Sequence, residues 1–161
     1  YVNKTHYIIS SSSYLYIGYM EKCSFNQVIT YPIKSYVTSF CLHEACLYFG
    51  LKNGSILYVT LEHVYNEIPF KLIESTDGKG IVALSLVKKN LLKNIYVFTE
   101  ESLKMYGEIE GGFKYSKSVQ IDSKIIKIVS KMTENDLLPC FMIWIQEYHG
   151  YPVLLTIKEL E

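Results

Sequence analysis

The chain contains four histidines that could bind a metal ion: His6, His43, His63 and His149. His43 has the richest surroundings, because Glu44 follows it and Cys41 and Cys46 lie on either side. A structural zinc site takes ligands from two such pairs at short spacing, and the sequence has no second pair. A polar residue at the connection between two strands explains His43 without a metal. We therefore expect no metal site.

Two cysteine–histidine pairs offer a nucleophile and a base, Cys46 with His43 and Cys140 with His149. A catalytic thiol must be exposed and activated, whereas both cysteines open apolar runs of core character. No C-x-x-C pair occurs. We interpret the cysteines as small buried hydrophobes in a reducing, intracellular compartment, cytoplasmic or nuclear. The spacing of Cys41 and Cys46 across a short connection is compatible with a disulfide.

Paired carboxylates are the remaining candidates for catalysis. Glu100-Glu101 lie at a predicted hairpin tip, and Glu108 and Glu110 precede Gly111-Gly112. A glycosidase needs two carboxylates in one cleft, whereas turn carboxylates are usually solvated. The glycines match neither G-x-G-x-x-G nor G-x-x-x-x-G-K, so no phosphate cradle is expected. We predict no catalytic or cofactor-binding residue and no small-molecule substrate.

Composition narrows the class of protein. The 161 residues suit one domain or part of one, and a hydrophobic share of 49% excludes a disordered chain. The 16 cations are all lysine and balance 16 acidic residues. Because arginine and a long lysine cluster are absent, we expect no nucleic-acid partner. No apolar run reaches the roughly 18 residues of a membrane span. Because Tyr1 is neither an initiator Met nor part of a signal peptide, we expect a segment of a longer chain.

Strand patterns follow one another at short spacing, and helical periodicity is almost absent. The clearest hairpin is CLYFGL-KNG-SILYVTL, because Asn53-Gly54 accepts positive φ at both central turn positions. The predicted strands are His6–Ser10, Ser13–Met20, Asn26–Thr30, Tyr36–His43, Cys46–Leu51, Ser55–Leu61, Phe70–Glu74, Gly80–Val87, Asn94–Thr99, Ser102–Glu108, Phe113–Ile121, Lys124–Ser130, Cys140–Gln146 and Pro152–Lys158.

These strands repeat as a unit of four, which we name a, b, c and d. The b strands begin near His6, Leu47, Asn94 and Cys140, and their b–c hairpins align. A four-stranded repeat of about 40 to 50 residues is typical of β-propeller blades. Such a blade is apolar on both faces and must stack on neighbours. The sequence therefore predicts an all-β fold of four-stranded antiparallel blades.

The spacing resembles that of the WD40-like β-propeller superfamily over nearly the whole chain. The Trp-Asp dipeptide and the Gly-His pair of regular WD40 blades are absent, and the only aspartates are Asp77, Asp122 and Asp136. The resemblance is therefore to divergent propellers of large scaffolds. It implies a non-catalytic subunit of an assembly, of nuclear-pore, vesicle-tethering, RNA-processing or ubiquitin-ligase type.

The chain begins in a b strand and ends in a c strand, so it supplies about three and a half blades. We place them at about residues 1–35, 36–79, 80–123 and 124–161 of a single partial domain. We favour half of a larger ring over a four-bladed ring that lacks two strands. Another part of the parent chain or a partner would complete it.

The b–c turns and d–a links of a propeller share one rim, where a protein partner could dock. Strand addition at an open edge is a second route. The links are Tyr31–Ser35, Thr76–Lys79 and Asp122–Ser123. The predicted contact residues of the turns are Lys52, Asn53, Glu100, Glu101, Tyr148, His149 and Tyr151. The alternative function is a compact all-β enzyme or small-ligand-binding domain with a deep pocket.

Overall fold

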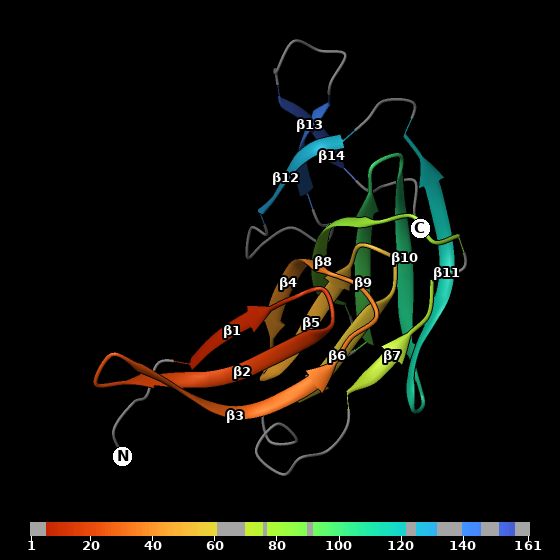
Figure 1. The fold of residues 1–161 in the computed structure, drawn as a ribbon. Helices are drawn as coiled ribbons and strands as arrows, with labels where there is room; N and C mark the ends of the chain where they lie inside the picture. The colour runs from red at the N-terminus through yellow and green to blue at the C-terminus, as the bar shows by residue number, and fades with distance from the viewer. Residues whose placement is uncertain are drawn as a thin grey trace.

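The described part of the chain is built entirely from antiparallel sheets. The computed structural model describes residues 6–60, 70–75, 77–89, 92–121, 125–131, 140–145 and 152–156, and these contain strands but no helix. Four sheets form, each a meander in which strands adjacent in sequence pair with one another (Figure 1). The all-β prediction is confirmed.

The first two sheets take up the N-terminal half of the chain. The first sheet consists of β1 (His6–Ser10), β2 (Tyr14–Glu21) and β3 (Ser24–Pro32), in the order β1-β2-β3. The second sheet consists of β4 (Val37–His43), β5 (Cys46–Leu51), β6 (Ile56–Thr60) and β7 (Lys71–Ile73), in the order β4-β5-β6-β7.

The other two sheets continue the same pattern. The third sheet consists of β8 (Ile81–Lys89), β9 (Leu92–Thr99), β10 (Ser102–Ile109) and β11 (Gly112–Gln120). The fourth sheet consists of β12 (Ile125–Lys131), β13 (Cys140–Ile145) and β14 (Pro152–Thr156). Every predicted strand is present, with ends that move by a few residues.

The turn of the β5–β6 hairpin differs from the predicted one. Gly54 has a φ of 84°, but Asn53 is not at positive φ. The Leu51 N–H donates to the Ser55 carbonyl at 2.9 Å, and the Gly54 N–H donates to the Leu51 carbonyl at 3.0 Å. The Asn53 Oδ1 accepts from the Ser55 N–H at 3.1 Å. The loop therefore has three residues and ends in a left-handed glycine.

Two other turns place ordinary residues in the left-handed region. Lys22 and Cys23 join β2 to β3 with φ values of 49° and 65°, and Glu44 and Ala45 join β4 to β5 at 46° and 59°. Positive φ at both central residues defines the type I′ turn that suits the twist of a hairpin. Cys23 is exposed at its tip, which corrects the prediction that every cysteine is buried.

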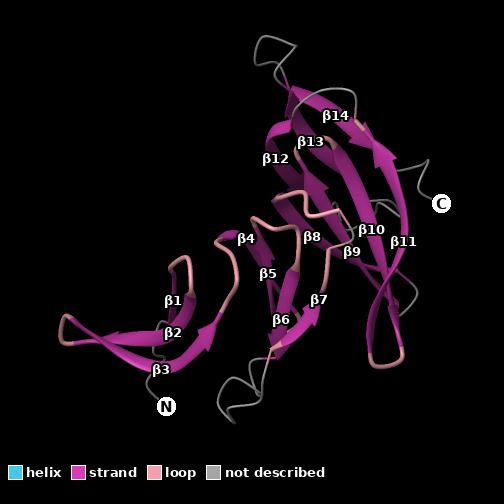
Figure 2. Ribbon diagram, turned by 45° about the vertical axis from the view of Figure 1, so that its right-hand side comes forward, coloured by secondary structure: helices cyan, strands magenta, loops and turns pink. Residues whose placement is uncertain are grey.

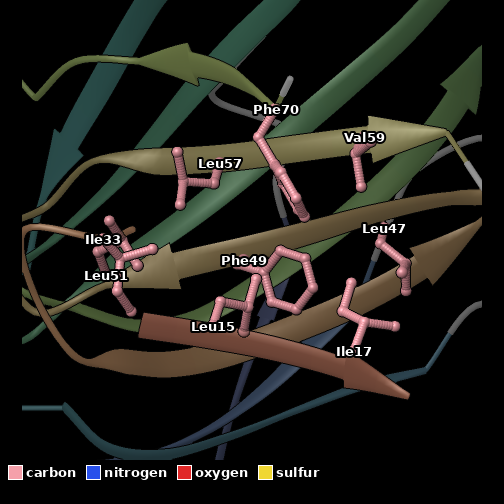
Figure 3. Packing of buried hydrophobic residues seen from close by; sticks show 9 residues of the cluster. All are labelled: Leu15, Ile17, Ile33, Leu47, Phe49, Leu51, Leu57, Val59 and Phe70. Atoms are coloured by element: carbon pink, nitrogen blue, oxygen red, sulfur yellow. The ribbon is translucent and has the colours of Figure 1, made fainter. Parts of the chain in front are cut away.

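The core lies between the sheets rather than inside any one of them. Side chains from β2, β5 and β6 fill the space between the first and second sheets, with Phe49 and Leu15 fully buried at its centre (Figure 3). A second cluster joins the second sheet to the third through Tyr48, Ile56 and Ile95. Successive residues of β5 enter different clusters, so this strand is buried on both faces, as a stacked blade requires.

The four sheets follow one another along an open arc in sequence order (Figure 2). The strand β8 lies beside β4 on one side and β12 on the other. The first and fourth sheets, at the two ends of the arc, have three described strands each, whereas the inner two have four. The described sheets do not close into a ring.

Candidate interaction surface

Turns and links from neighbouring sheets meet at one end of the arc. Because consecutive strands run in opposite directions, every second connection of a meander lies at the same end. The β5–β6 turn with Lys52 and Asn53, the β9–β10 turn with Glu100 and Glu101, and the link 74–80 between sheets share this end, which we call the rim. Tyr148, His149 and Tyr151, together with Thr76 and Asp122–Ser123, lie outside the described residues.

A groove of about 560 Å³ opens at the rim between the second and third sheets. Three of the predicted contact residues, Lys52, Glu100 and Glu101, line this groove. Its other walls come from the starts of β4 and β8 and from the end of the link: Thr38, Lys79, Gly80, Ile81 and Val82. Lys79 belongs to the predicted link Thr76–Lys79, whereas the contributions of Thr38, Ile81 and Val82, near the starts of strands that follow links, were not predicted.

The link between the two sheets is held in one conformation by its own side chains. The Ser75 hydroxyl donates to Asp77 Oδ1 at 3.0 Å and accepts from the Gly78 N–H at 3.0 Å. Asp77 Oδ1 also accepts from the Lys79 N–H at 3.2 Å. Local side-chain bonds of this kind are typical of Asp and Ser in turns. They fix the position from which Lys79 reaches the groove.

A buried lysine ties this link to the third sheet. Lys104 on β10 donates from Nζ to Asp77 Oδ1 at 2.6 Å, and only 6% of its side chain is exposed. Partial burial of Asp77 raises the pKa of its carboxyl, but hydrogen bonds from Lys104, the Lys79 N–H and Ser75 outweigh this and hold the pKa below its usual value. Asp77 is therefore a charged anchor for the link.

The groove walls carry charges of both signs. Lys79 from the link forms an ion pair with Glu101 across the mouth of the groove.

The β5–β6 turn packs against the link so closely that a Cβ on Gly54 would lie 2.5 Å from the Lys79 carbonyl oxygen. Glycine is therefore required at this position for two reasons, the positive φ and the close approach.

Buried hydroxyls hold the turn that carries the acidic wall. Thr99 and Ser102 lie before and after Glu100 and Glu101, and both are buried. The Thr99 Oγ1 accepts from the Ser102 N–H at 3.0 Å and lies 2.7 Å from the Ser102 Oγ. This leaves both glutamates exposed at a rigid tip.

Comparison with solved structures shows which known fold this chain resembles. A computationally designed protein, Ika4, aligns over 96% of this chain and 86% of its own, with a TM-score of 0.61 and 11% identity. The WD40 domain of SCAP from fission yeast aligns over 96% of this chain, with a TM-score of 0.58 and 11% identity. The chain has a WD40-like β-propeller fold. It spans 42% of that WD40 domain, so the likeness concerns the fold of a part of it.

Sequence comparison does not assign the chain to a family. No protein-family model matches the chain, and a search of the curated proteins finds no match.

Within the part of the chain that the structure describes, no helix is long and apolar enough to cross a membrane.

The fourth described contact residue, Asn53, faces a different groove. It lies between the first and second blades, has a volume of about 300 Å³ and is lined by apolar residues that include Ile33, Leu51 and Leu72. The side chains of Lys34 and Glu74 stand at this groove as well. The predicted rim therefore contains two grooves, and the adjacent residues Lys52 and Asn53 line different grooves.

The cysteine–histidine pairing shows no activated nucleophile. Burial raises the pKa of the Cys46 thiol, and it raises that of Cys41 in the same way. The register places His43 opposite Cys46 and Cys41 opposite Tyr48, and both cysteines are free thiols. The described residues hold no group of three or more His, Cys, Asp or Glu side chains able to bind a metal. Cys140 and His149 lie where no side chain is described.

The end opposite the rim holds the second and third blades together. Glu44 in the β4–β5 turn accepts from Lys88 at 2.8 Å and from Lys93 at 3.0 Å. These two hydrogen bonds lower the pKa of Glu44 to about 2. Ion pairs therefore connect the second and third blades at this end, and other ion pairs connect the link to the third blade at the rim.

Proposed function

We propose that the chain is a non-catalytic protein-interaction scaffold and a subunit of a larger assembly. The observation that supports this most is the rim groove, in which the exposed side chains of Lys52, Glu100 and Glu101 stand on rigid turns of two blades. Rigid elements that present charged groups suit recognition of a polar partner surface, because little order must be created on binding. The proposal includes an intracellular location, which rests on the cysteine usage of the sequence.

The proposed partner is a protein. A groove with both lysine and glutamate walls favours a polypeptide that carries charges of both signs. The balanced net charge and the absence of arginine disfavour a phosphate backbone. Charged rim contacts mainly set the association rate and the register of binding, so binding should weaken as salt rises.

The proposal can be tested by selecting ligands from a library of displayed random peptides with the immobilised chain. We expect enriched peptides whose affinity falls at least about tenfold for the variant that combines Lys52→Glu with Glu100→Lys. This variant reverses charge on both walls and leaves the net charge unchanged. The matched control combines Lys114→Glu with Glu110→Lys, which lie on β11 and the turn before it, away from the rim.

Two outcomes would contradict the proposal. One is failure to enrich any peptide with a chain that melts cooperatively. The other is enrichment of peptides that bind the wild type, the rim variant and the control variant equally well.

A further inference from the structure

The smaller groove at the rim, which contains Asn53, continues the apolar core to the surface. Its floor is one end of the core cluster, where Ile33, Leu51 and Leu57 are buried (Figure 3). Leu72 on β7 is opposite Leu57 in the register, so the two side chains share one face of the sheet. Leu72 is nevertheless 49% exposed. We call this site the apolar groove.

The apolar groove does not open at a free strand edge of the first sheet. Its described lining residues come from the end of β3, the link after β3, the β5–β6 hairpin and the end of β7, and none belongs to β1. The sheet order places β1 and β3 at opposite edges. A further strand paired with β1 would therefore not reach this groove.

Polar groups that are able to bind a ligand surround the apolar floor. Lys34 and Glu74 line the groove, are exposed, and form no ion pair with any described residue. The Asn53 Oδ1 accepts from the Ser55 N–H, which leaves the Asn53 amino group able to donate at the groove. An apolar site bordered by both charges and an amide suits an apolar side chain of a polypeptide with charged neighbours.

The apolar groove and the rim groove share two walls. The β5–β6 turn contributes Asn53 to one and Lys52 to the other, and the link after β7 contributes Glu74 and Lys79 in the same way. Turn and link are in close contact at Gly54, so the ridge between the grooves is one turn thick. An extended polypeptide advances about 3.3 Å per residue, so a few residues cross this ridge.

We propose that one extended segment of a partner protein occupies both grooves. An apolar side chain of the segment lies in the apolar groove, the chain crosses the β5–β6 turn, and charged side chains enter the rim groove. The inference rests on the proposed function and specifies the partner. A segment that fills both grooves loses its translational freedom once, so it binds more tightly than either half alone.

The probe is a displayed library of random ten-residue peptides, sequenced after selection on the immobilised 161-residue chain. We expect enriched peptides to share one apolar position and, a few residues away, charged positions. Leu72→Thr should remove the apolar preference and weaken binding of an enriched peptide at least about tenfold. The matched control is Leu92→Thr, which changes a leucine that is 59% exposed at the opposite end of the third blade and should leave affinity unchanged.

A charge exchange tests how the peptide lies in the apolar groove. The variant that combines Lys34→Glu with Glu74→Lys keeps the net charge and should invert the preferred charges next to the apolar position. The rim variant with Lys52→Glu and Glu100→Lys should change only the preferred charges on the far side of the spacer. Each variant therefore reports on one groove.

Separate synthesis of the two halves of an enriched peptide tests whether one segment spans both grooves. Each half should bind at least about tenfold more weakly than the joined peptide, because the intact segment engages both sites at once. Equal affinity of the joined peptide and its charged half would overturn the inference.

Two further results would also overturn it. One is an enriched set in which the rim variant weakens binding while Leu72→Thr and Leu92→Thr have equal effects, which leaves the proposed function intact. The other is a chain that sediments as a dimer and that Leu72→Thr dissociates, which would assign the apolar groove to a second copy. Binding that the rim variant does not weaken contradicts the proposed function itself.

Discussion

Asp77 is the residue on which the geometry of the rim depends most. Its Oδ1 accepts from Lys104, from the Lys79 N–H and from the Ser75 hydroxyl, so one carboxylate joins the link to the third blade. The sequence does not reveal that Lys104 pairs with Asp77, because the two residues lie 27 positions apart.

The first prediction concerns this pair. Asp77→Asn should lower the free energy of unfolding by about 2 kcal/mol, because it leaves the Lys104 ammonium buried without a counter-charge. The value is below that for a fully buried pair because the Asp77 side chain is 35% exposed and solvent screens it. Urea denaturation measures the change. Adding Lys104→Met should recover part of the loss, since the double variant buries no unpaired charge.

The same pair gives a pH dependence of defined sign. The folded-state pKa of Asp77 is below its unfolded value of about 4, so its contribution is complete above that value. The contribution is lost as pH falls through the folded pKa. The stability difference between wild type and Asp77→Asn should therefore shrink in acid, and a difference that is constant from neutral pH down to well below about 4 would contradict this.

At the scale of elements, the hairpin turns carry unrelieved strain. Ala45 has a φ of 59° in the β4–β5 turn, where an L-residue other than glycine is unfavourable. Ala45→Gly should raise the free energy of unfolding by about 1 kcal/mol, measured by urea denaturation. Ala83→Gly is the matched control, because Ala83 lies within β8 at ordinary φ, where glycine should destabilise by about 1 kcal/mol. Equal effects of the two substitutions would refute the strain argument.

Elements differ in how well the sequence predicts them. The strand Cys46–Leu51 is found with its exact bounds, since its apolar run and the following Asn-Gly are local signals. The type of the following turn is not predicted correctly, because whether Asn53 takes positive φ depends on one extra residue in the loop. Cys23 looks apolar by type, but its burial depends on its place at a turn tip. Local pattern therefore fixes strands better than turns or exposure.

At the scale of the whole molecule, the sequence predicts some features of the candidate site and misses others. The alternation of turns between two ends follows from strand count, so the sequence predicts that Lys52, Glu100 and Glu101 share a rim. The separation of Lys52 and Asn53 into two grooves depends on how closely adjacent blades stack, which is a property of side chains distant in sequence.

The whole-molecule prediction compares two strands that occupy the same place in their blades. The strand β5 is paired on both edges and buried on both faces, whereas β1 is paired with β2 alone among the described strands. Hydrogen exchange of backbone amides, resolved by residue with NMR, should show slow exchange throughout β5. In β1, alternate amides should exchange faster by about two orders of magnitude or more, because they lack a strand partner. Uniform protection along β1 would mean that both of its edges are paired, and it would contradict this prediction.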